Sequence, residues 1–280
     1  ISEGFIHGTS EYLEELGMKY YSELILRNLI EPGIQYIDDP VFNMHDVVRS
    51  FAQFVARDEA VAVQSGENGN ISELTGQKFL HLSIESKVSK SEALDWSSLQ
   101  AQSTLRTLIS VGHINLKHGD SLVNFPCIRT LHIDSAHVVT LVESLHEIKH
   151  LRYLSLENTD ISSLPDSIGK MKFLQYISLR GCKEIVQVPH SIVMLEQLRY
   201  LNLDNTNING IPKGFRVLTN LRIVSGFPAQ EEDDWCSLEE LGSLSQLNEL
   251  SLESLENVSS ALLAAKAWIN AKKQLTYLGL

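Results

Sequence analysis

Apolar residues along most of this 280-residue chain follow the spacing L-x-x-L-x-L, which returns at a nearly fixed interval. The pattern starts at residues 105, 128, 151, 174, 198 and 221, so successive starts lie 23, 23, 23, 24 and 23 residues apart. A period kept through five steps indicates a repeat architecture in which each unit stacks on its neighbours. Within a unit, alternate leucines of a short strand would point into the core, and the residues between them would face outward.

The second half of each unit also repeats, in its clearest form as I-x-x-L-P-x-x-I. Its prolines are Pro165, Pro189 and Pro212. Because proline cannot donate a backbone hydrogen bond, these residues should lie where the chain has left the strands and returns along the convex side. Thr159, Cys182 and Thr206 share a slot at the end of the strand, where a small side chain can hydrogen-bond the turning backbone. The sequence therefore predicts a structural role for Cys182 and not a reactive thiol.

These units resemble leucine-rich repeats, and the form with L-P in the second half resembles the cytosolic plant version of that family. The resemblance covers about residues 77–280 and implies an α/β fold, a horseshoe-shaped solenoid with a parallel concave sheet. Residues 79–84 are the expected first strand. After residue 221 the spacing stretches to 26 and 28 residues, and the insert at 231–235 is expected to be a solvated acidic loop.

Residues 1–58 do not repeat, and they predict a small α+β unit. A first helix should stop before Pro32, because proline and the following glycine end helices. Short strands are expected at 34–37 and 41–42, and a second helix should begin near Asp46, a good N-cap residue. Helix, strand pair and helix suggest part of a winged-helix unit.

A linker is expected between this unit and the repeats, at residues 59–76, because the stretch contains polar residues and glycines. The second helix carries Val47, Phe51 and Phe54 on one face. The chain thus predicts three parts: a winged-helix part, a linker and a repeat array.

The string Asn43-Met44-His45-Asp46 stands directly before the second helix. Together with the helix upstream and the repeats downstream, it resembles the Met-His-Asp motif of plant intracellular immune receptors, which combine coiled-coil, nucleotide-binding and leucine-rich-repeat regions. The resemblance implies that Met44, His45 and Asp46 form an ADP-sensing motif, with His45 near the phosphates and Asp46 organising the local turn. An imidazole N–H suits a phosphate oxygen, and a carboxylate just before a helix can bind free backbone N–H groups. A merely structural histidine is the alternative.

The same resemblance implies a segment of a cytoplasmic disease-resistance receptor of the NLR class. Its repeats would recognise a pathogen effector or a modified host protein. They would also contact the nucleotide-binding core and restrain an ADP/ATP-dependent switch that leads to the hypersensitive response. No G-x-x-x-x-G-K-[ST] loop occurs, so ADP or ATP is expected in the full-length protein, and neither enzymatic activity nor tight nucleotide binding in this chain alone.

Two other classes remain open: repeats that select substrates for a ubiquitin ligase, and an extracellular receptor ectodomain. Three dispersed cysteines and the lack of a visible export signal oppose the second. No apolar run approaches the roughly 20 residues of a membrane helix.

Charge narrows the list of partners further. The chain holds 23 basic and 35 acidic residues, a net charge of −12, which disfavours nucleic acid and anionic membranes. Residues 1–58 contain 4 of the basic and 10 of the acidic residues, so a basic surface elsewhere in the receptor could engage them. The 41 leucines against 7% aromatic residues show that leucine fills the core.

One string matches a metalloprotease pattern, because His146-Glu147-Ile148-Lys149-His150 reads H-E-x-x-H. That chemistry needs both histidines one turn apart on a continuous helix. Alignment of the repeats puts Leu151 at the start of a strand, so no helix should continue past His150. The sequence therefore predicts no metal site and no catalytic residues here.

Outward positions of successive strands should form columns on the concave sheet. The columns are Thr130, Tyr153, Tyr176 and Tyr200; His132, Ser155, Ser178 and Asn202; and Asp134, Glu157, Arg180 and Asp204. Exposed tyrosines are typical interface anchors, so the candidate protein-recognition surface is Asp134, Tyr153, Ser155, Glu157, Tyr176, Ser178, Arg180, Tyr200, Asn202 and Asp204. Alternatively, the tyrosines are ordinary filler of this repeat type and pack against their neighbours.

Overall fold

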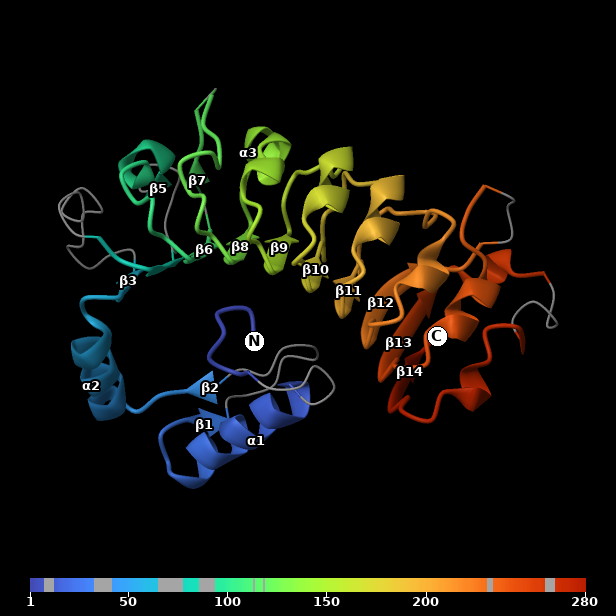
Figure 1. Cartoon of the computed structure of the whole chain (residues 1–280), viewed down its shortest axis with the longest axis horizontal. Coiled ribbons are helices and arrows are strands. Elements are labelled where there is room, and N and C mark those ends of the chain that lie inside the picture. Colours follow the sequence, from blue (N-terminus) through green and yellow to red (C-terminus); the bar gives the residue numbers. More distant parts are fainter. Residues whose placement is uncertain are drawn as a thin grey trace.

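The structure is a computed structural model that describes residues 1–7, 13–32, 42–64, 78–85, 94–112, 114–117, 119–230, 234–259 and 265–280. These residues form an arc whose inner face is one parallel β-sheet (Figure 1). Its ten strands are β3 (Ala60–Gln64), β4 (His81–Glu85), β6 (Thr107–Val111), β8 (Thr130–Asp134), β9 (Tyr153–Glu157), β10 (Tyr176–Ser178), β11 (Tyr200–Asn202), β12 (Ile223–Pro228), β13 (Glu249–Glu253) and β14 (Tyr277–Gly279). Sheet order follows chain order, which confirms the predicted solenoid.

Short helices cover the convex side of the arc. They are α3 (Val139–Glu143) and the 3₁₀ segments Trp96–Leu99, Leu145–Glu147, Asp166–Lys170, His190–Met194, Phe215–Val217, Leu238–Ser243, Leu255–Asn257 and Ile269–Ala271. A separate parallel pair, β5 (Leu94–Asp95) and β7 (Ile114–Asn115), lies near the N-terminal end of the array. Pro165 and Pro189 each directly precede a 3₁₀ segment, as predicted. Pro212 instead forms one isolated antiparallel bridge with Trp235, the last residue of the insert. Residues 231–233 of that insert lie outside the described residues.

The core is a stack of leucines and isoleucines between the sheet and the convex segments. In one unit, Leu151, Leu154 and Leu156 are at most 1% exposed. After the strand the chain turns through a residue with positive φ, such as Asn158 at 51° or Gly181 at 74°. Glycine and asparagine tolerate this conformation best, so their recurrence at this slot fits the backbone that each turn needs.

The slot shared by Thr159, Cys182 and Thr206 has its predicted role. The hydroxyls of Thr159 and Thr206 donate to the carbonyls of Leu156 and Leu203, at 3.0 and 2.8 Å. The Cys182 thiol donates to the Leu156 carbonyl at 2.7 Å and lies 3.2 Å from the Thr159 hydroxyl. Burial raises the pKa of the Cys182 thiol, so the residue is structural.

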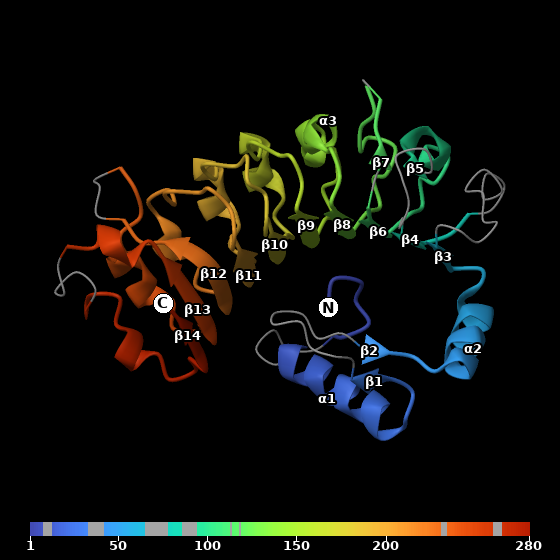
Figure 2. The same ribbon diagram turned by 180° about the vertical axis from the view of Figure 1, so that it is seen from behind.

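Four elements precede the sheet: α1 (Leu13–Leu26), β1 (Glu31–Pro32), β2 (Phe42–Asn43) and α2 (Asp46–Ala56). The chain start, β1, β2 and α1 lie in the hollow of the arc, and the view from behind shows the same arrangement (Figure 2). β1 and β2 form an antiparallel pair, but β1 falls before the expected range, and residues 34–37 lie outside the described residues.

Two expectations for this region differ from the structure. The N-cap of α2 is His45, whose Nδ1 accepts a hydrogen bond from the backbone N–H of Val47 at 3.3 Å, and Asp46 is the first helical residue. Residues 60–64, expected in the linker, form β3 at the edge of the sheet. Val61 and Val63 alternate toward the core there and pack against it, which explains the strand. No described helix has the length and apolar character of a membrane-spanning segment.

Candidate protein-recognition surface

Tyr153, Tyr176 and Tyr200 lie in register on three neighbouring strands, as the repeat alignment predicts. Their rings stack face to face, with centroids 4.0 Å apart in both pairs and interplanar angles of 12° and 8°. Each ring is half-buried. Burial, with the neighbouring phenols, raises the pKa of Tyr176 well above its usual range. The three rings therefore form an aromatic stack that crosses three repeats.

In the second predicted column, His132 is half-buried and the other three residues are buried. Ser155 and Ser178 are fully buried, and Asn202 is 5% exposed, although all three stand between inward leucines. Ser155 donates to Glu157 at 3.0 Å, and the Asn202 amide donates to the Tyr200 hydroxyl at 3.2 Å. Ser155 and Asn202 can therefore position residues of the flanking columns, but none of the three buried residues offers the contact surface that the sequence suggested.

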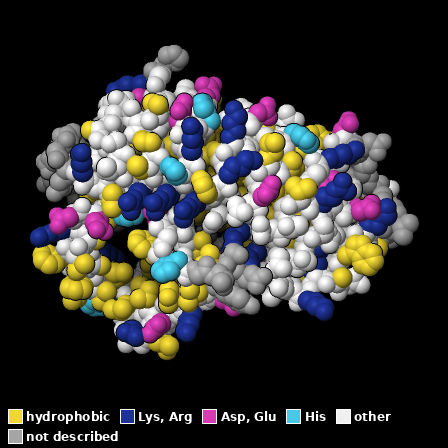
Figure 3. Space-filling model, in the orientation of Figure 1, with side chains coloured by type: hydrophobic (Ala, Val, Ile, Leu, Met, Phe, Trp, Pro, Cys, Tyr) yellow, Lys and Arg dark blue, Asp and Glu magenta, His cyan; other side chains and the backbone are white. Residues whose placement is uncertain are grey.

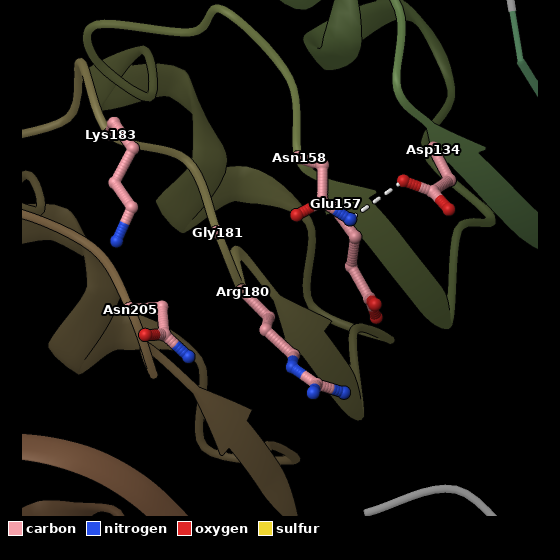
Figure 4. Close-up of a pocket in the computed structure, with 7 residues that line it drawn as sticks. All are labelled: Asp134, Glu157, Asn158, Arg180, Gly181, Lys183 and Asn205. Carbon is pink, nitrogen blue, oxygen red and sulfur yellow. Dashed lines mark hydrogen bonds between the residues drawn. The ribbon is translucent and has the colours of Figure 1, made fainter. Parts of the chain in front are cut away.

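Charged residues lie where the strands end, around an open cavity of about 430 Å³ (Figure 4). The cavity is lined by Asp134, Glu157, Asn158, Arg180, Gly181, Lys183 and Asn205. Asp134 and Glu157 are in register, and the Asn158 amide donates to Asp134 at 2.9 Å. Arg180 follows the end of β10, and Asp204 follows the end of β11 and does not line the cavity. This strand-end column brings three of the predicted site residues together.

A second charged column, at the opposite ends of the strands, was missed by the sequence analysis. Arg106, Arg129, Arg152, Arg199 and Arg222 each stand one residue before a strand, and Gln175 takes this position before β10. We call these five residues the arginine column. All five are half-buried. In the space-filling view, Lys and Arg side chains form a row along the inner rim of the arc (Figure 3). The recurrence of arginine directly after the first apolar residue of a unit is the signal that could have revealed this column.

The start of the chain lies against the arginine column. One oxygen of the Glu3 carboxylate accepts hydrogen bonds from the hydroxyls of Thr107 and Thr130, at 2.8 and 2.7 Å. Arg129 donates to the backbone carbonyl of Glu3 at 3.4 Å. Residues more than 100 positions apart in the sequence are therefore joined by a carboxylate that bridges two neighbouring repeats.

Further along the column the same kind of contact recurs. Arg152 donates to the backbone carbonyl of Ser2 at 3.3 Å. Glu14, in the first turn of α1, forms ion pairs with Arg199 and, at 3.7 Å, with Arg222. The two arginine side chains are only 13% and 16% exposed, so salt screens these pairs less than pairs on an open surface. The basic surface that the acidic N-terminal part was expected to engage is thus present within this chain.

Two residues of the predicted ADP-sensing motif, His45 and Asp46, lie at the exposed start of α2. Met44 lines an open cavity of about 340 Å³ between α2 and the first strands, together with Arg49 and His81. The cavity walls are mostly apolar side chains of α2, β3, β4 and β6.

The H-E-x-x-H string has the predicted geometry, because the 3₁₀ segment ends at Glu147 and no helix follows before β9. His146 donates to the Glu143 carbonyl at 3.0 Å, and its other ring nitrogen lies 3.1 Å from the Glu147 carboxylate. His150 stacks on Phe173, with ring centroids 6.2 Å apart. Among the residues that the structure describes, no three His, Cys, Asp or Glu side chains are grouped to hold a metal ion.

Comparisons with known proteins agree with this architecture. The family model described as "Leucine-rich repeat region" matches residues 78–271. No curated protein sequence matches the chain significantly. Among solved structures, an internalin (InlF) from Listeria monocytogenes is similar at 16% identity and a TM-score of 0.54, over 78% of this chain and 60% of the internalin.

Two further structures are similar over most of this chain. The leucine-rich repeat domain of the type III effector XopL has 17% identity and a TM-score of 0.47, over 83% of this chain and 81% of that domain. TLR13, in its complex with ssRNA13, has 17% identity and a TM-score of 0.48, over 79% of this chain and 35% of that protein. Identities this low show at most the fold. The family model, in contrast, covers more than half of the chain, so this protein belongs to the leucine-rich repeat family.

Proposed function

We propose that this chain is the segment of a plant intracellular immune receptor that joins the end of its nucleotide-binding region to its leucine-rich repeats. The observation that carries the proposal is the contact between the acidic N-terminal part and the arginine column, through Glu3 and Glu14. A repeat array that holds the preceding region in its concave face can restrain that region until a ligand favours another arrangement.

The geometry of His45 supports a role as a hydrogen-bond donor to a nucleotide phosphate in the full-length receptor. Because its Nδ1 accepts a hydrogen bond from Val47, the proton of the neutral ring lies on Nε2. That N–H is the kind of donor that a phosphate oxygen of ADP accepts. Asp46, in the first turn of α2, places a negative charge at the positive end of the helix dipole. We propose that ADP in the off state and ATP in the on state are the nucleotides of the whole protein.

The exposed apolar face of α2 supports an intramolecular contact with the nucleotide-binding core. Val47, Phe51, Phe54 and Val55 are between 63% and 71% exposed. Hydrophobic side chains gather over the N-terminal elements in the space-filling view (Figure 3). A contiguous apolar patch on a protein surface is typical of an interface. The remaining concave surface would recognise a pathogen effector or a modified host protein.

Charge reversal in the full-length receptor tests this function. Glu14→Arg should weaken the restraint and cause cell death in leaves without any effector, because it places like charges beside Arg199 and Arg222. His45→Ala should also cause cell death without an effector, because it removes the imidazole N–H that donates a hydrogen bond to the phosphate. Combining Glu14→Arg with Arg199→Glu should restore the quiet state.

The matched control is Glu15→Arg. Glu15 is exposed on the same turn as Glu14, and its replacement by arginine changes the net charge by the same amount. It should stay quiet. The receptor proposal would be wrong if Glu14→Arg and His45→Ala were both silent in a protein that accumulates normally, or if Glu15→Arg were as active as Glu14→Arg.

A further inference from the structure

We propose that the arginine column is a binding site for an acidic segment of a partner protein, and that Ser2, Glu3 and Glu14 occupy this site as a substitute for that segment. The proposal rests on the protein-binding part of the proposed function, and it is independent of the receptor's place in plant immunity.

The contacts of the chain's own segment show which chemistry the column recognises. Arg129 and Arg152 donate to backbone carbonyls, as they could for any extended polypeptide. Carboxylates supply the rest. The Glu3 carboxylate accepts hydrogen bonds from the Thr107 and Thr130 hydroxyls, each one residue after an arginine of the column, and so bridges the repeats of β6 and β8. The Glu14 carboxylate pairs with Arg199 and Arg222 and bridges the repeats of β11 and β12. Each carboxylate thus spans two neighbouring repeats, one on each side of the gap that Gln175 leaves in the column. An acidic peptide segment offers both kinds of acceptor.

The spacing of the two bridges sets the spacing of acidic residues in the partner. From the midpoint between β6 and β8 to the midpoint between β11 and β12 there are four strand intervals. At about 4.8 Å each they span roughly 19 Å, which an extended chain covers in about six residues. A partner segment with two acidic residues six positions apart therefore fits the site.

The other edge of the sheet gives the site its selectivity. Asp134, Glu157 and Glu253 end their strands, and Asp204 follows β11, so acidic residues outnumber the basic Arg180 and Lys183 at this edge. An acidic segment is attracted to the arginine column and repelled by the opposite edge. The concave face therefore holds such a segment at the strand starts, where residues 2, 3 and 14 lie now.

The test uses the whole 280-residue chain and a fluorescent ten-residue Ser/Gly peptide with glutamates at its third and ninth positions. Binding is measured by fluorescence anisotropy at low ionic strength. Replacing Glu3 and Glu14 by Gln together should raise the affinity for the peptide about tenfold, since the site no longer holds competing carboxylates. In that background, Arg129→Gln with Arg199→Gln should reduce binding at least tenfold.

Three controls make the result specific. Lys170→Gln with Lys213→Gln removes two exposed positive charges from the convex side and should leave binding unchanged. Peptides with glutamines in place of the glutamates, or with glutamates three positions apart, should bind at least fivefold more weakly. Circular dichroism should give the same spectrum for every variant, because none of the changes removes a hydrogen bond between two backbone groups of the helices or strands.

Unchanged affinity after the double Glu→Gln substitution would overturn the proposal, as would equal binding of the two glutamate spacings. Tighter binding of a ten-nucleotide oligothymidylate than of the peptide would assign the column to nucleic acid instead. These outcomes are separate from the leaf assay. Silent Glu14→Arg and His45→Ala receptors together with positive peptide binding would refute the immune-switch function alone. Active receptor variants together with no peptide binding would refute the acidic-segment site alone.

Discussion

The tyrosine stack makes a prediction that separates its two interpretations, packing filler and binding patch. Tyr176 stacks on Tyr153 and on Tyr200 at 4.0 Å, whereas each outer ring has only one partner in the stack. An aromatic pair contributes about 0.5–1.5 kcal/mol beyond its buried area. Tyr176→Leu should therefore lower the free energy of unfolding by about 2 kcal/mol, and Tyr153→Leu by about 1 kcal/mol.

Urea unfolding followed by circular dichroism measures both values. Tyr176→Phe is the matched control, because it keeps the ring and both stacking contacts and removes only the hydroxyl. Its cost should stay below about 1 kcal/mol, the typical net value of one hydrogen bond. Equal costs for Tyr176→Leu and Tyr153→Leu would refute a packing role for the stack and leave recognition as the reason for the column.

Two further predictions concern ionisable side chains. Burial raises the pKa of Tyr176, so this phenol keeps its proton in the folded state while it ionises near pH 10 in the unfolded chain. The free energy of unfolding should therefore fall as the pH rises above about 10. In urea titrations at pH 9 and 11, the free energy of unfolding of the Tyr176→Phe variant should fall less steeply. Burial also raises the pKa of the Cys182 and Cys236 thiols, whereas Cys127 is exposed. A disulfide reagent at pH 8 should thus modify one thiol per folded chain and three in urea, and rapid native modification of Cys182 would contradict its structural role.

The predicted recognition surface is the feature for which sequence and structure differ most. Repeat alignment placed Ser155, Ser178 and Asn202 on the concave face, and they do stand there in register. All three side chains are nevertheless buried. Period-2 alternation predicts which side of a sheet a residue faces, but its accessibility on that side depends on what packs over it in three dimensions.

The same distinction applies at the start of α2. The imidazole of His45 and the carboxylate of Asp46 stand next to each other in the sequence, and preference scales favour the aspartate as the N-cap. The backbone enters the helix one residue earlier, so His45 takes the N-cap position and Asp46 adds its charge to the first turn. Helix ends are set by the geometry of the incoming chain, which a single sequence does not specify to one residue.

The sequence by itself determined the solenoid. Leucines that must be buried every 23 residues fix the strands and their register. They also fix the position of Pro165 and Pro189 on the convex side and the structural role of Cys182. All of these features depend only on neighbouring repeats of the same pattern. Only the tertiary structure decided what lies in the concave face. The contacts of Glu3 with Thr130 and of Glu14 with Arg199 join residues 127 and 185 positions apart. Such pairings arise from long-range charge and shape, for which no local period exists.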